Sequence, residues 1–310
     1  MSSFRNISFV MPVLNEERHL AEAVASVYAQ EVPGEMELVL CLGPSKDKTN
    51  EVARGLQQRF PHLQLTQIDV SNTSLALNTA IKKAKHEVVL RVDAHSKLGE
   101  GYAIRAIRVL NETQAANVGG VMVAQGVTSF EQAVAFAYNN RIGLGGGAYH
   151  VGAKPGPQDS VYLGVFDKSK LLKVGGFDAN WIRGQDWELN LRLRDSGYLV
   201  WFDPDLKVTY RPRSSWLALA KQFFSTGTWR GALTRRSPAD AAFRYWIPPL
   251  LVLSLLFVIP LWLYLIAIAF VATTAAGVSG RAKILLILVL PTMHLSWGLG
   301  FWLGFIRKAI

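Results

Sequence analysis

The segment Val88-Val89-Leu90-Arg91-Val92-Asp93-Ala94-His95 decides the fold class. It reads as a short apolar strand that ends on an aspartate and a histidine. Three earlier apolar runs also read as strands, and helical periodicity fills the stretches between them. The expected strands are Ile7 to Val13, Leu38 to Leu42, Leu63 to Ile68 and Val88 to Val92, and the expected helices are Glu16 to Ala29, Asn50 to Phe60 and Leu75 to Ala84. This alternation predicts an α/β fold with a mostly parallel sheet, in which ligands bind beyond the carboxyl ends of the strands.

The composition limits what the rest of the chain can be. Of 310 residues, 50% are hydrophobic and 18% are charged, which excludes a disordered, collagenous or low-complexity protein. The formal net charge is +10. The single cysteine, Cys41, excludes an intramolecular disulfide and a Cys-rich metal site, and it favours a reducing compartment. The apolar run near the N-terminus leads into Asn15 and two glutamates rather than a cleavage site, so no signal peptide is expected.

Hydrophobicity is concentrated near the C-terminus. Ile247 to Ala276 contains no charged residue, and Ile284 to Ile306 contains only His294 as an ionisable one. Both blocks exceed the ~20 apolar residues that span a bilayer, and a pair of buried core helices is the alternative. Because Pro260 falls inside the first block, that block is either one tilted helix or a tight pair. We therefore expect a transmembrane region of two or three helices over residues 246–310.

A basic segment, residues 211–245, precedes these blocks. It holds seven basic residues and one acidic residue, Asp240. The basic residues are Arg211, Arg213, Lys221, Arg230, Arg235, Arg236 and Arg244. By the positive-inside rule this side is cytoplasmic. Ser215 to Trp229 has the spacing of a helix that lies in the membrane interface, with an ordinary amphipathic helix packed on the domain as the alternative. We expect contact with anionic membrane lipid and no nucleic-acid partner. Residues 1–210 remain as a soluble domain.

Asp93 and His95 form the strongest candidate metal site. If the strand continues as far as His95, both side chains leave the same face at its carboxyl end. Such a pair can hold a divalent ion that neutralises a diphosphate leaving group. A histidine in place of a carboxylate softens the site and favours Mn²⁺ over Mg²⁺. The alternative is a strand-ending aspartate beside a surface histidine.

A second group of polar residues begins at Gln185-Asp186-Trp187-Glu188-Leu189-Asn190. The apolar spacing that follows predicts a helix with Asp186 and Glu188 in its first turn. A helix N-terminus keeps a carboxylate ionised, as a general base requires. The alternative is that Asp186 caps the helix and has no chemical role.

Together these motifs resemble glycosyltransferase family 2, whose members are inverting enzymes with a Rossmann-like GT-A fold. The resemblance is carried by Val10-Met11-Pro12-Val13-Leu14-Asn15-Glu16-Glu17, by Arg91-Val92-Asp93-Ala94-His95 as an Asp-x-Asp-like motif, and by Gly176-Phe177-Asp178 with the segment from Gln185 to Asn190. It extends over essentially the whole chain. Within the family the sequence looks most like the membrane-anchored, ExoA-like branch that serves succinoglycan biosynthesis.

The resemblance implies a role for each matching residue. The implied nucleotide pocket consists of Pro12, Asn15, Glu16 and Asp93. The implied metal ligands are Asp93 and His95, and the implied general base is Asp186. On the acceptor side are Gln185, Trp187 and Glu188, to which we add Arg211 and Arg213. These two arginines precede the expected membrane region, where they could bind anionic phosphates of the acceptor. The alternative is that they bind lipid headgroups.

The sequence departs from the family pattern at two points. The family usually has two acidic residues after its second strand, and Leu42-Gly43-Pro44-Ser45 stands there instead, so a UDP-sugar is only a first choice of donor. Processive members usually carry Gln-x-x-Arg-Trp, whereas Gln222 is followed much later by Trp229-Arg230. This predicts a non-processive enzyme.

The predicted function is metal-dependent, inverting sugar transfer from a nucleotide-sugar to a saccharide carried on a polyprenyl diphosphate. The enzyme is expected as a multi-pass protein of the inner or plasma membrane, with its catalytic domain in the cytoplasm and a polysaccharide-assembly complex as a partner. Two alternatives stay open. One is a polyprenyl-phosphate monosaccharide synthase, whose ionised acceptor needs no base, and the other is a catalytically silent membrane protein that binds a nucleotide-sugar.

Overall fold

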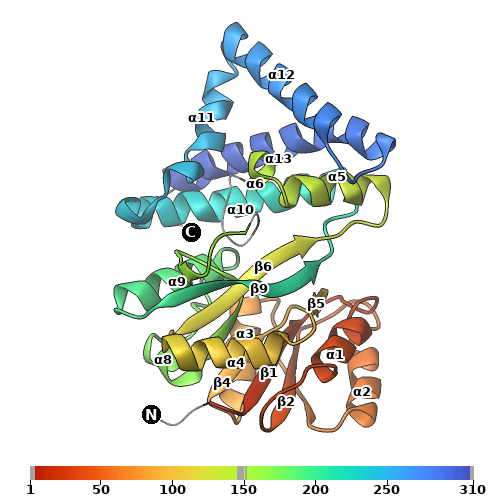
Figure 1. The fold of residues 1–310 in the computed structure, drawn as a ribbon, viewed down its shortest axis with the longest axis vertical. Coiled ribbons are helices and arrows are strands. Elements are labelled where there is room, and N and C mark those ends of the chain that lie inside the picture. The colour runs from red at the N-terminus through yellow and green to blue at the C-terminus, as the bar shows by residue number, and fades with distance from the viewer. Residues whose placement is uncertain (1–3, 145–149, 151, 308–310) are drawn as a thin grey trace. The chain divides into compact units, whose positions relative to one another are not determined.

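The computed structural model describes residues 4–144, 150 and 152–307, and the chain divides into two compact units (Figure 1). The sheet unit consists of residues 1–122 and 152–210. The helical unit consists of residues 123–151 and 211–310. Residues 123–151, from the middle of the sequence, therefore belong with the C-terminal helices. The expected division at residue 210 placed them in the first domain.

The sheet unit is built on one mixed sheet with the strand order β3-β2-β1-β4-β8-β6-β9-β5, and β7 pairs with β9. The strands are β1 (Ile7–Val13), β2 (Met36–Leu42), β3 (Leu63–Gln67), β4 (Val88–Arg91), β5 (Ser96–Leu98), β6 (Asn117–Ala124), β7 (Gly156–Pro157), β8 (Tyr162–Asp167) and β9 (Val200–Tyr210). The strands β1 to β4 are parallel, which confirms the predicted βαβα half of the fold. The strand β8 is antiparallel to both β4 and β6.

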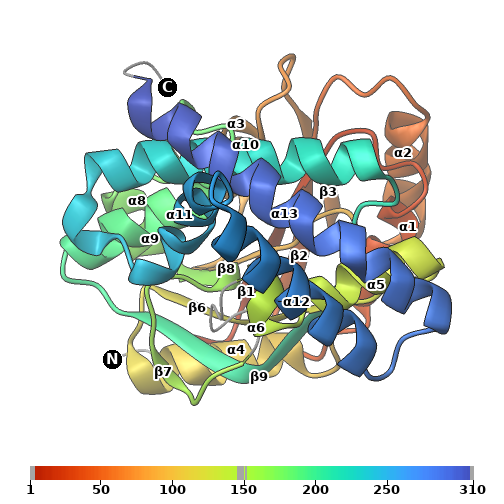
Figure 2. The same ribbon diagram turned by 90° about the horizontal axis from the view of Figure 1, so that it is seen from above.

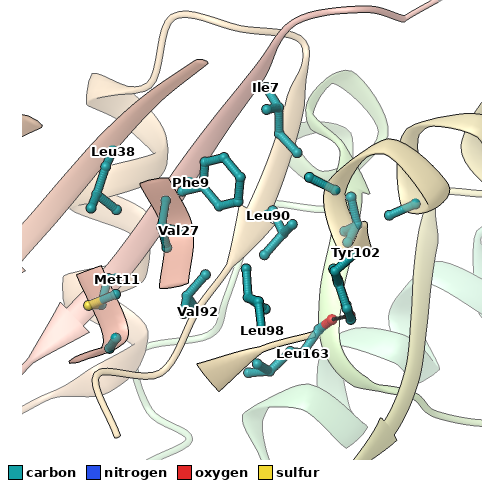
Figure 3. Packing of buried hydrophobic residues seen from close by; sticks show 14 of the residues in the cluster. Ile7, Phe9, Met11, Val27, Leu38, Leu90, Val92, Leu98, Tyr102 and Leu163 are labelled. Carbon is teal, nitrogen blue, oxygen red and sulfur yellow. Dashed lines mark hydrogen bonds between the residues drawn. The ribbon is translucent and has the colours of Figure 1, made fainter. Parts of the chain in front are cut away.

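Six helices accompany the sheet among the described residues. They are α1 (Leu20–Tyr28), α2 (Thr49–Arg59), α3 (Thr73–Lys83), α4 (Tyr102–Thr113), α8 (Lys168–Lys173) and α9 (Gln185–Asp195). Of these, α1, α2, α3 and α9 are the ones that the sequence predicts. Alternate residues of β1, namely Ile7, Phe9 and Met11, are fully buried in the core against Val27 and Leu90 (Figure 3). This packing fixes the register of β1, because a slip of one residue would turn these side chains to the other face.

The helix α1 begins four residues later than predicted. The carbonyl oxygen of Glu16 accepts hydrogen bonds from the N–H groups of His19 and Leu20, at 3.1 and 3.0 Å, so a turn precedes the helix. Asn15 has a φ angle of 56°, a conformation that asparagine tolerates better than most residues. Residues 14–19 are therefore a loop at the carboxyl end of β1.

The helical unit contains α5 (Ser129–Tyr138), α6 (Arg141–Leu144), α10 (Trp216–Arg236), α11 (Ile247–Ser254), α12 (Val258–Thr274) and α13 (Gly280–Ile306). Short 3-10 helices, Pro238–Asp240 and Phe243–Tyr245, connect α10 to α11. The helix expected from Ser215 is present as α10. Its N-cap is Ser215, whose hydroxyl accepts a hydrogen bond from the N–H of Ala218 at 3.4 Å. The helices α10 and α13 lie side by side (Figure 2).

The expectation of two or three membrane spans is not supported. In the part of the chain that the structure describes, only α13 is long and apolar enough to cross a bilayer, and 44% of its most apolar window is buried inside the protein. Core helices of soluble proteins pass the same test, so this is weak support for a span. The first apolar block is divided between α11 and α12. Pro248 and Pro249 stand in the first turn of α11, where a missing N–H costs little.

Candidate active site

The candidate site lies beyond the carboxyl ends of β1, β2 and β4. The loop after β1 and the loop after β2 are joined by hydrogen bonds. The N–H of Asn15 donates to the hydroxyl of Ser45 at 3.1 Å, and the side-chain oxygen of Asn15 accepts from the N–H of Lys46 at 2.7 Å. The N–H of Glu16 donates to the hydroxyl of Thr49 at 2.7 Å. These bonds hold Glu16 in place at the sheet edge.

Asp93 and His95 are brought together by a turn rather than by a strand. The strand β4 ends at Arg91, and the carbonyl oxygen of Asp93 accepts a hydrogen bond from the N–H of Ser96 at 2.9 Å. The condition that the strand continues as far as His95 is therefore not met. Both residues still lie in the connection between β4 and β5, at the carboxyl end of β4.

Glu16 and His95 form a carboxylate–histidine pair. The Oε1 atom of Glu16 lies 2.8 Å from Nδ1 of His95, across 79 positions of sequence. Hydrogen bonding of Nδ1–H to a carboxylate fixes the tautomer in which Nε2 carries the ring's lone pair. Glu16 therefore contacts the imidazole of His95. Its predicted role, in the nucleotide pocket, did not include this contact.

A buried arginine links the two candidate aspartates. The side chain of Arg91 is 6% exposed. Its Nε donates to Oδ1 of Asp93 at 3.0 Å, and its NH1 forms a very short ion pair with Oδ1 of Asp186. The guanidinium also lies over the ring of Phe177, 5.9 Å from the centroid. Arg91 has no predicted role, although a charged residue at the end of an apolar strand was a usable signal.

Arg91 affects the two carboxylates with different results. Burial alone would raise the pKa of Asp93, but the charges of Arg91 and His95 and the hydrogen bond from Arg91 hold it below its ordinary value. Burial raises the pKa of Asp186, and the negative charge of Asp93 adds to that effect. Arg91 opposes both, yet the pKa of Asp186 stays above its ordinary value. Asp186 is thus the stronger base of the two, and its side chain is 38% exposed.

The helix α9 is held in place by a buried amide network. The Nδ2 of Asn117 donates to Oδ1 of Asn190 at 2.7 Å, and the Nδ2 of Asn190 donates to the hydroxyl of Ser160 at 3.0 Å. Gly184, with a φ of 72°, is the N-cap. The predicted helix is thus confirmed, and Asp186 and Glu188 stand in its first turn, at the positive end of the helix dipole.

The residues predicted for the acceptor lie in different environments. Gln185 is buried, and Trp187 is half-buried. Glu188 is 2% exposed and forms a bidentate ion pair with Arg192, with both N–O distances 2.7 Å. Arg192 also donates to the carbonyl oxygen of Gly176 at 2.8 Å. Arg192 therefore joins α9 to the Gly175-Gly176 turn, and Glu188 holds the guanidinium of Arg192. An acceptor role for Glu188 stays a prediction.

The other predicted residues are placed as follows. Pro12 lies in β1 and pairs in register with Cys41 of β2. Arg211 and Arg213 belong to the helical unit, where Nε of Arg213 donates to the side-chain oxygen of Gln222 at 3.2 Å. Their phosphate-binding role stays a prediction.

Asp93 and His95 are the residues of the site that suit a divalent cation. No group of three or more His, Cys, Asp or Glu side chains gathers as a metal site in residues 4–144, 150 and 152–307. The pair offers one carboxylate and one imidazole, with Glu16 behind the imidazole. This donor set fits a cation that takes its other ligands from a diphosphate and from water.

Comparison with known proteins shows which proteins share this arrangement. The family model for glycosyl transferase family 2 matches residues 8–156, which include Glu16, Arg91, Asp93 and His95. A relative of similar length matches over nearly the whole chain. The succinoglycan biosynthesis protein ExoA of Rhizobium meliloti (strain 1021) is 26% identical over 307 residues, which cover 94% of this chain and 93% of that protein. The chain is a glycosyltransferase with a family 2 match over residues 8–156. Over nearly its whole length it is similar to ExoA.

Three other similar proteins extend the comparison. A dolichyl N-acetyl-alpha-D-glucosaminyl phosphate 3-beta-D-2,3-diacetamido-2,3-dideoxy-beta-D-glucuronosyltransferase of Methanococcus voltae is 27% identical over 241 residues, 74% of each chain. The mannosyltransferase PcManGT of Pyrobaculum calidifontis, solved with GDP-Man and Mn²⁺, has a TM-score of 0.64 at 18% identity and covers 97% of this chain and 87% of its own. TarS 1–349 of S. aureus has a TM-score of 0.53 at 14% identity and covers 96% and 90%. The two structures confirm the GT-A fold.

Proposed function

We propose that this glycosyltransferase moves a sugar from a nucleotide-sugar, with UDP as the first choice of nucleotide, to a lipid-linked saccharide with inversion at the anomeric carbon. The observation that carries the proposal is the pairing of Asp186 with Arg91, the same side chain that holds Asp93. It brings a candidate base from α9 to the loop after β4. In a single in-line displacement, the base and the departing diphosphate stand on opposite sides of the reacting carbon.

Asp186 takes the proton of the acceptor hydroxyl. Its Oδ1 is engaged by Arg91, so the proton goes to Oδ2. The raised pKa of Asp186, which burial causes, makes it a better proton acceptor than an ordinary aspartate. The positive end of α9 and the guanidinium of Arg91 both keep it charged before the acceptor arrives.

Asp93 and His95 would hold the divalent cation and, through it, the donor diphosphate. The cation, when bound, neutralises charge on the leaving diphosphate. Glu16, through its contact with Nδ1, would keep Nε2 of His95 available as a ligand. The mixed oxygen and nitrogen donor set favours Mn²⁺ over Mg²⁺. The presence of GDP-Man and Mn²⁺ in a GT-A neighbour supports a cation-assisted reaction and leaves the nucleotide base open.

A lipid-linked acceptor is supported by one relative and by charge. The name of the Methanococcus voltae enzyme gives a dolichyl-linked sugar as its acceptor. The name of ExoA, a succinoglycan biosynthesis protein, supports a role in polysaccharide synthesis. We infer a non-processive role in polysaccharide or glycan synthesis at the cytoplasmic face of the membrane. In this arrangement residues 1–210 form the catalytic domain, and Arg211 and Arg213 in the basic segment bind phosphate groups at the lipid surface.

The test is the substitution Asp186→Asn, assayed as sugar transfer with purified protein and a membrane lipid extract. We expect nucleotide-sugar binding to stay nearly unchanged and turnover to fall at least ~100-fold. Asp195→Asn, at the exposed C-terminal end of the same helix, is the matched control and should keep full turnover. More than about a tenth of wild-type turnover in Asp186→Asn would remove this residue from the role of base.

A further inference from the structure

The exposed apolar surface of the helical unit extends along α11, α12 and α13, and its most exposed large side chain, Leu256, lies at the apex where α11 meets α12. The most exposed large side chains at this apex are Leu256 (82%), Ile259 (75%), Val258 (69%) and Phe257 (67%). No charged residue occurs from Ile247 to Ala276. The two helices form a hairpin that rises from the layer of α10 and α13 and returns to it (Figure 1). An apolar apex of this kind requires a nonaqueous partner.

The hairpin is too short to reach across a bilayer. The helix α12 has 17 residues, about 25 Å at 1.5 Å per residue, whereas the hydrocarbon core is ~30 Å thick. Even if α12 stood along the membrane normal, its apex would remain in the hydrocarbon. The apex residues Leu255, Leu256 and Phe257 carry no polar group that would meet the far headgroups.

The backbone of the apex is suited to an apolar medium. The N–H of Phe257 donates to the carbonyl oxygen of Ser254 at 3.0 Å, and the hydroxyl of Ser254 donates to the carbonyl oxygen of Leu251 at 2.8 Å. The first N–H groups of a helix have no acceptor within the helix. Pro260 stands in the first turn of α12 and has no N–H, so one such unpaired donor is absent. Polar backbone groups in hydrocarbon must be satisfied internally in this way.

The helix α13 is fixed along α10 by close backbone contact. A Cβ atom at Gly227 of α10 would overlap the carbonyl oxygen of Trp297, and one at Gly304 of α13 would overlap the carbonyl oxygen of Thr228. The guanidinium of Arg235 donates to the carbonyl oxygen of Arg307, just beyond the end of α13. The two helices run in the same direction side by side (Figure 2).

This contact decides the orientation of α13. If α13 crossed the membrane, α10 would have to cross with it and carry Lys221, Arg235 and Arg236 into hydrocarbon, which is strongly disfavoured. Twelve of the 33 basic residues but only two of the 23 acidic residues, Glu131 and Asp240, belong to the helical unit. Such a charge excess suits the headgroup layer of an anionic leaflet.

We propose that the helical unit is monotopic: α10 and α13 lie in the membrane interface, the α11–α12 hairpin dips into one leaflet, and none of the described helices crosses the bilayer. Both ends of α12 and both ends of α13 then belong to the cytoplasmic leaflet. This topology is independent of the transfer reaction, so its test does not depend on the role of Asp186.

The test uses the full chain with one added cysteine at Leu256, Ala276 or Arg307, all exposed, with wild type as the baseline because its Cys41 is buried. A membrane-impermeant maleimide is applied to inside-out and right-side-out vesicles from the expressing cells. We expect Ala276→Cys and Arg307→Cys to be labelled from the cytoplasmic side alone, and Leu256→Cys to be labelled only after detergent is added. Labelling of any of the three from the outer face, or of Leu256→Cys from the cytoplasmic face of intact vesicles, would overturn the proposal.

A second measurement tests insertion directly. Leu256→Asp should weaken binding of the protein to phosphatidylglycerol–phosphatidylcholine vesicles at least ~10-fold, because a carboxylate is placed in hydrocarbon. The matched control is Ile104→Asp, an exposed apolar position on α4 of the sheet unit, which should leave vesicle binding unchanged. Equal vesicle binding by Leu256→Asp and wild type would refute the insertion of the apex.

Discussion

Arg91 and Asp186 form an ion pair across 95 positions of sequence, and the same guanidinium donates to Asp93. One buried side chain thus sets the spacing between the candidate base and the candidate cation ligand. It also opposes the mutual repulsion of the two carboxylates and so keeps both ionised.

Arg91→Met should lower turnover at least ~10-fold and move the acid limb of the turnover–pH profile to higher pH. A base works only when deprotonated, so activity is lost as the pH falls through its pKa. Removing Arg91 leaves burial and Asp93, which both raise the pKa of Asp186, so the loss begins at a higher pH. The measurement is the pH dependence of turnover at saturating donor and acceptor.

Arg91→Lys is the control for this experiment, since it keeps a positive charge near both aspartates. We expect a smaller shift of the acid limb than in Arg91→Met. Thermal unfolding of both variants separates the loss of a positioning charge from general instability. An acid limb that stays in place in Arg91→Met would show that this arginine does not control the base.

Glu16→Gln should weaken Mn²⁺ binding by about 10- to 100-fold, the usual effect of losing a carboxylate behind a ligating histidine. Calorimetric titration of Mn²⁺ in the presence of UDP measures this without an activity assay. Glu22→Gln, an exposed carboxylate on α1, is the matched control. Unchanged Mn²⁺ affinity in Glu16→Gln would contradict the pairing of Glu16 with His95 as a support for the cation.

Cation removal gives a separate prediction. Transfer activity should disappear in EDTA and should return better with Mn²⁺ than with Mg²⁺, because the site combines an imidazole with a carboxylate. The measurement is nucleotide diphosphate release at matched free cation concentrations. Full activity in the chelator would exclude a required divalent cation.

Glu188→Ala should lower the free energy of unfolding by about 2 kcal/mol. This is less than the ~3–5 kcal/mol for breaking a fully buried pair, because Arg192 is 24% exposed. Denaturant unfolding measures the change, and a double-mutant cycle with Arg192→Ala isolates the pair. If Glu188 instead binds the acceptor, the variant would raise the acceptor KM with little change in stability.

Gly304→Val should destabilise the helical unit by ~1–3 kcal/mol, since its side chain would overlap the backbone of α10. Protease resistance of the C-terminal helices in detergent measures the effect. Gly280→Ala, where an added Cβ meets no atom within 4 Å, is the control and should match wild type. Equal resistance in both variants would show that α10 and α13 are not in close contact.

The parallel half of the sheet and the first turn of α9 could be predicted because both leave local patterns in the sequence. The pairs Arg91–Asp186 and Glu16–His95 could not be predicted. Their partners lie 95 and 79 positions apart, and such contacts depend on tertiary structure. The sequence left open whether the first apolar block is one tilted helix or a pair, and the structure breaks it at Leu255–Phe257. A helix whose faces are all apolar has no hydrophobic periodicity, so the sequence does not show where it ends. Pro260 indicated only that the block could be one helix or two.

The partition of charge has a consequence for how the two substrates are found. Because the whole +10 belongs to the helical unit, the sheet unit carries as many acidic as basic residues. A nucleotide-sugar dianion is then not drawn to the sheet unit from afar. It is recognised only within the roughly 10 Å over which individual charges act at 0.1 M salt. Raising the ionic strength should consequently loosen attachment to lipid long before it impairs capture of the donor.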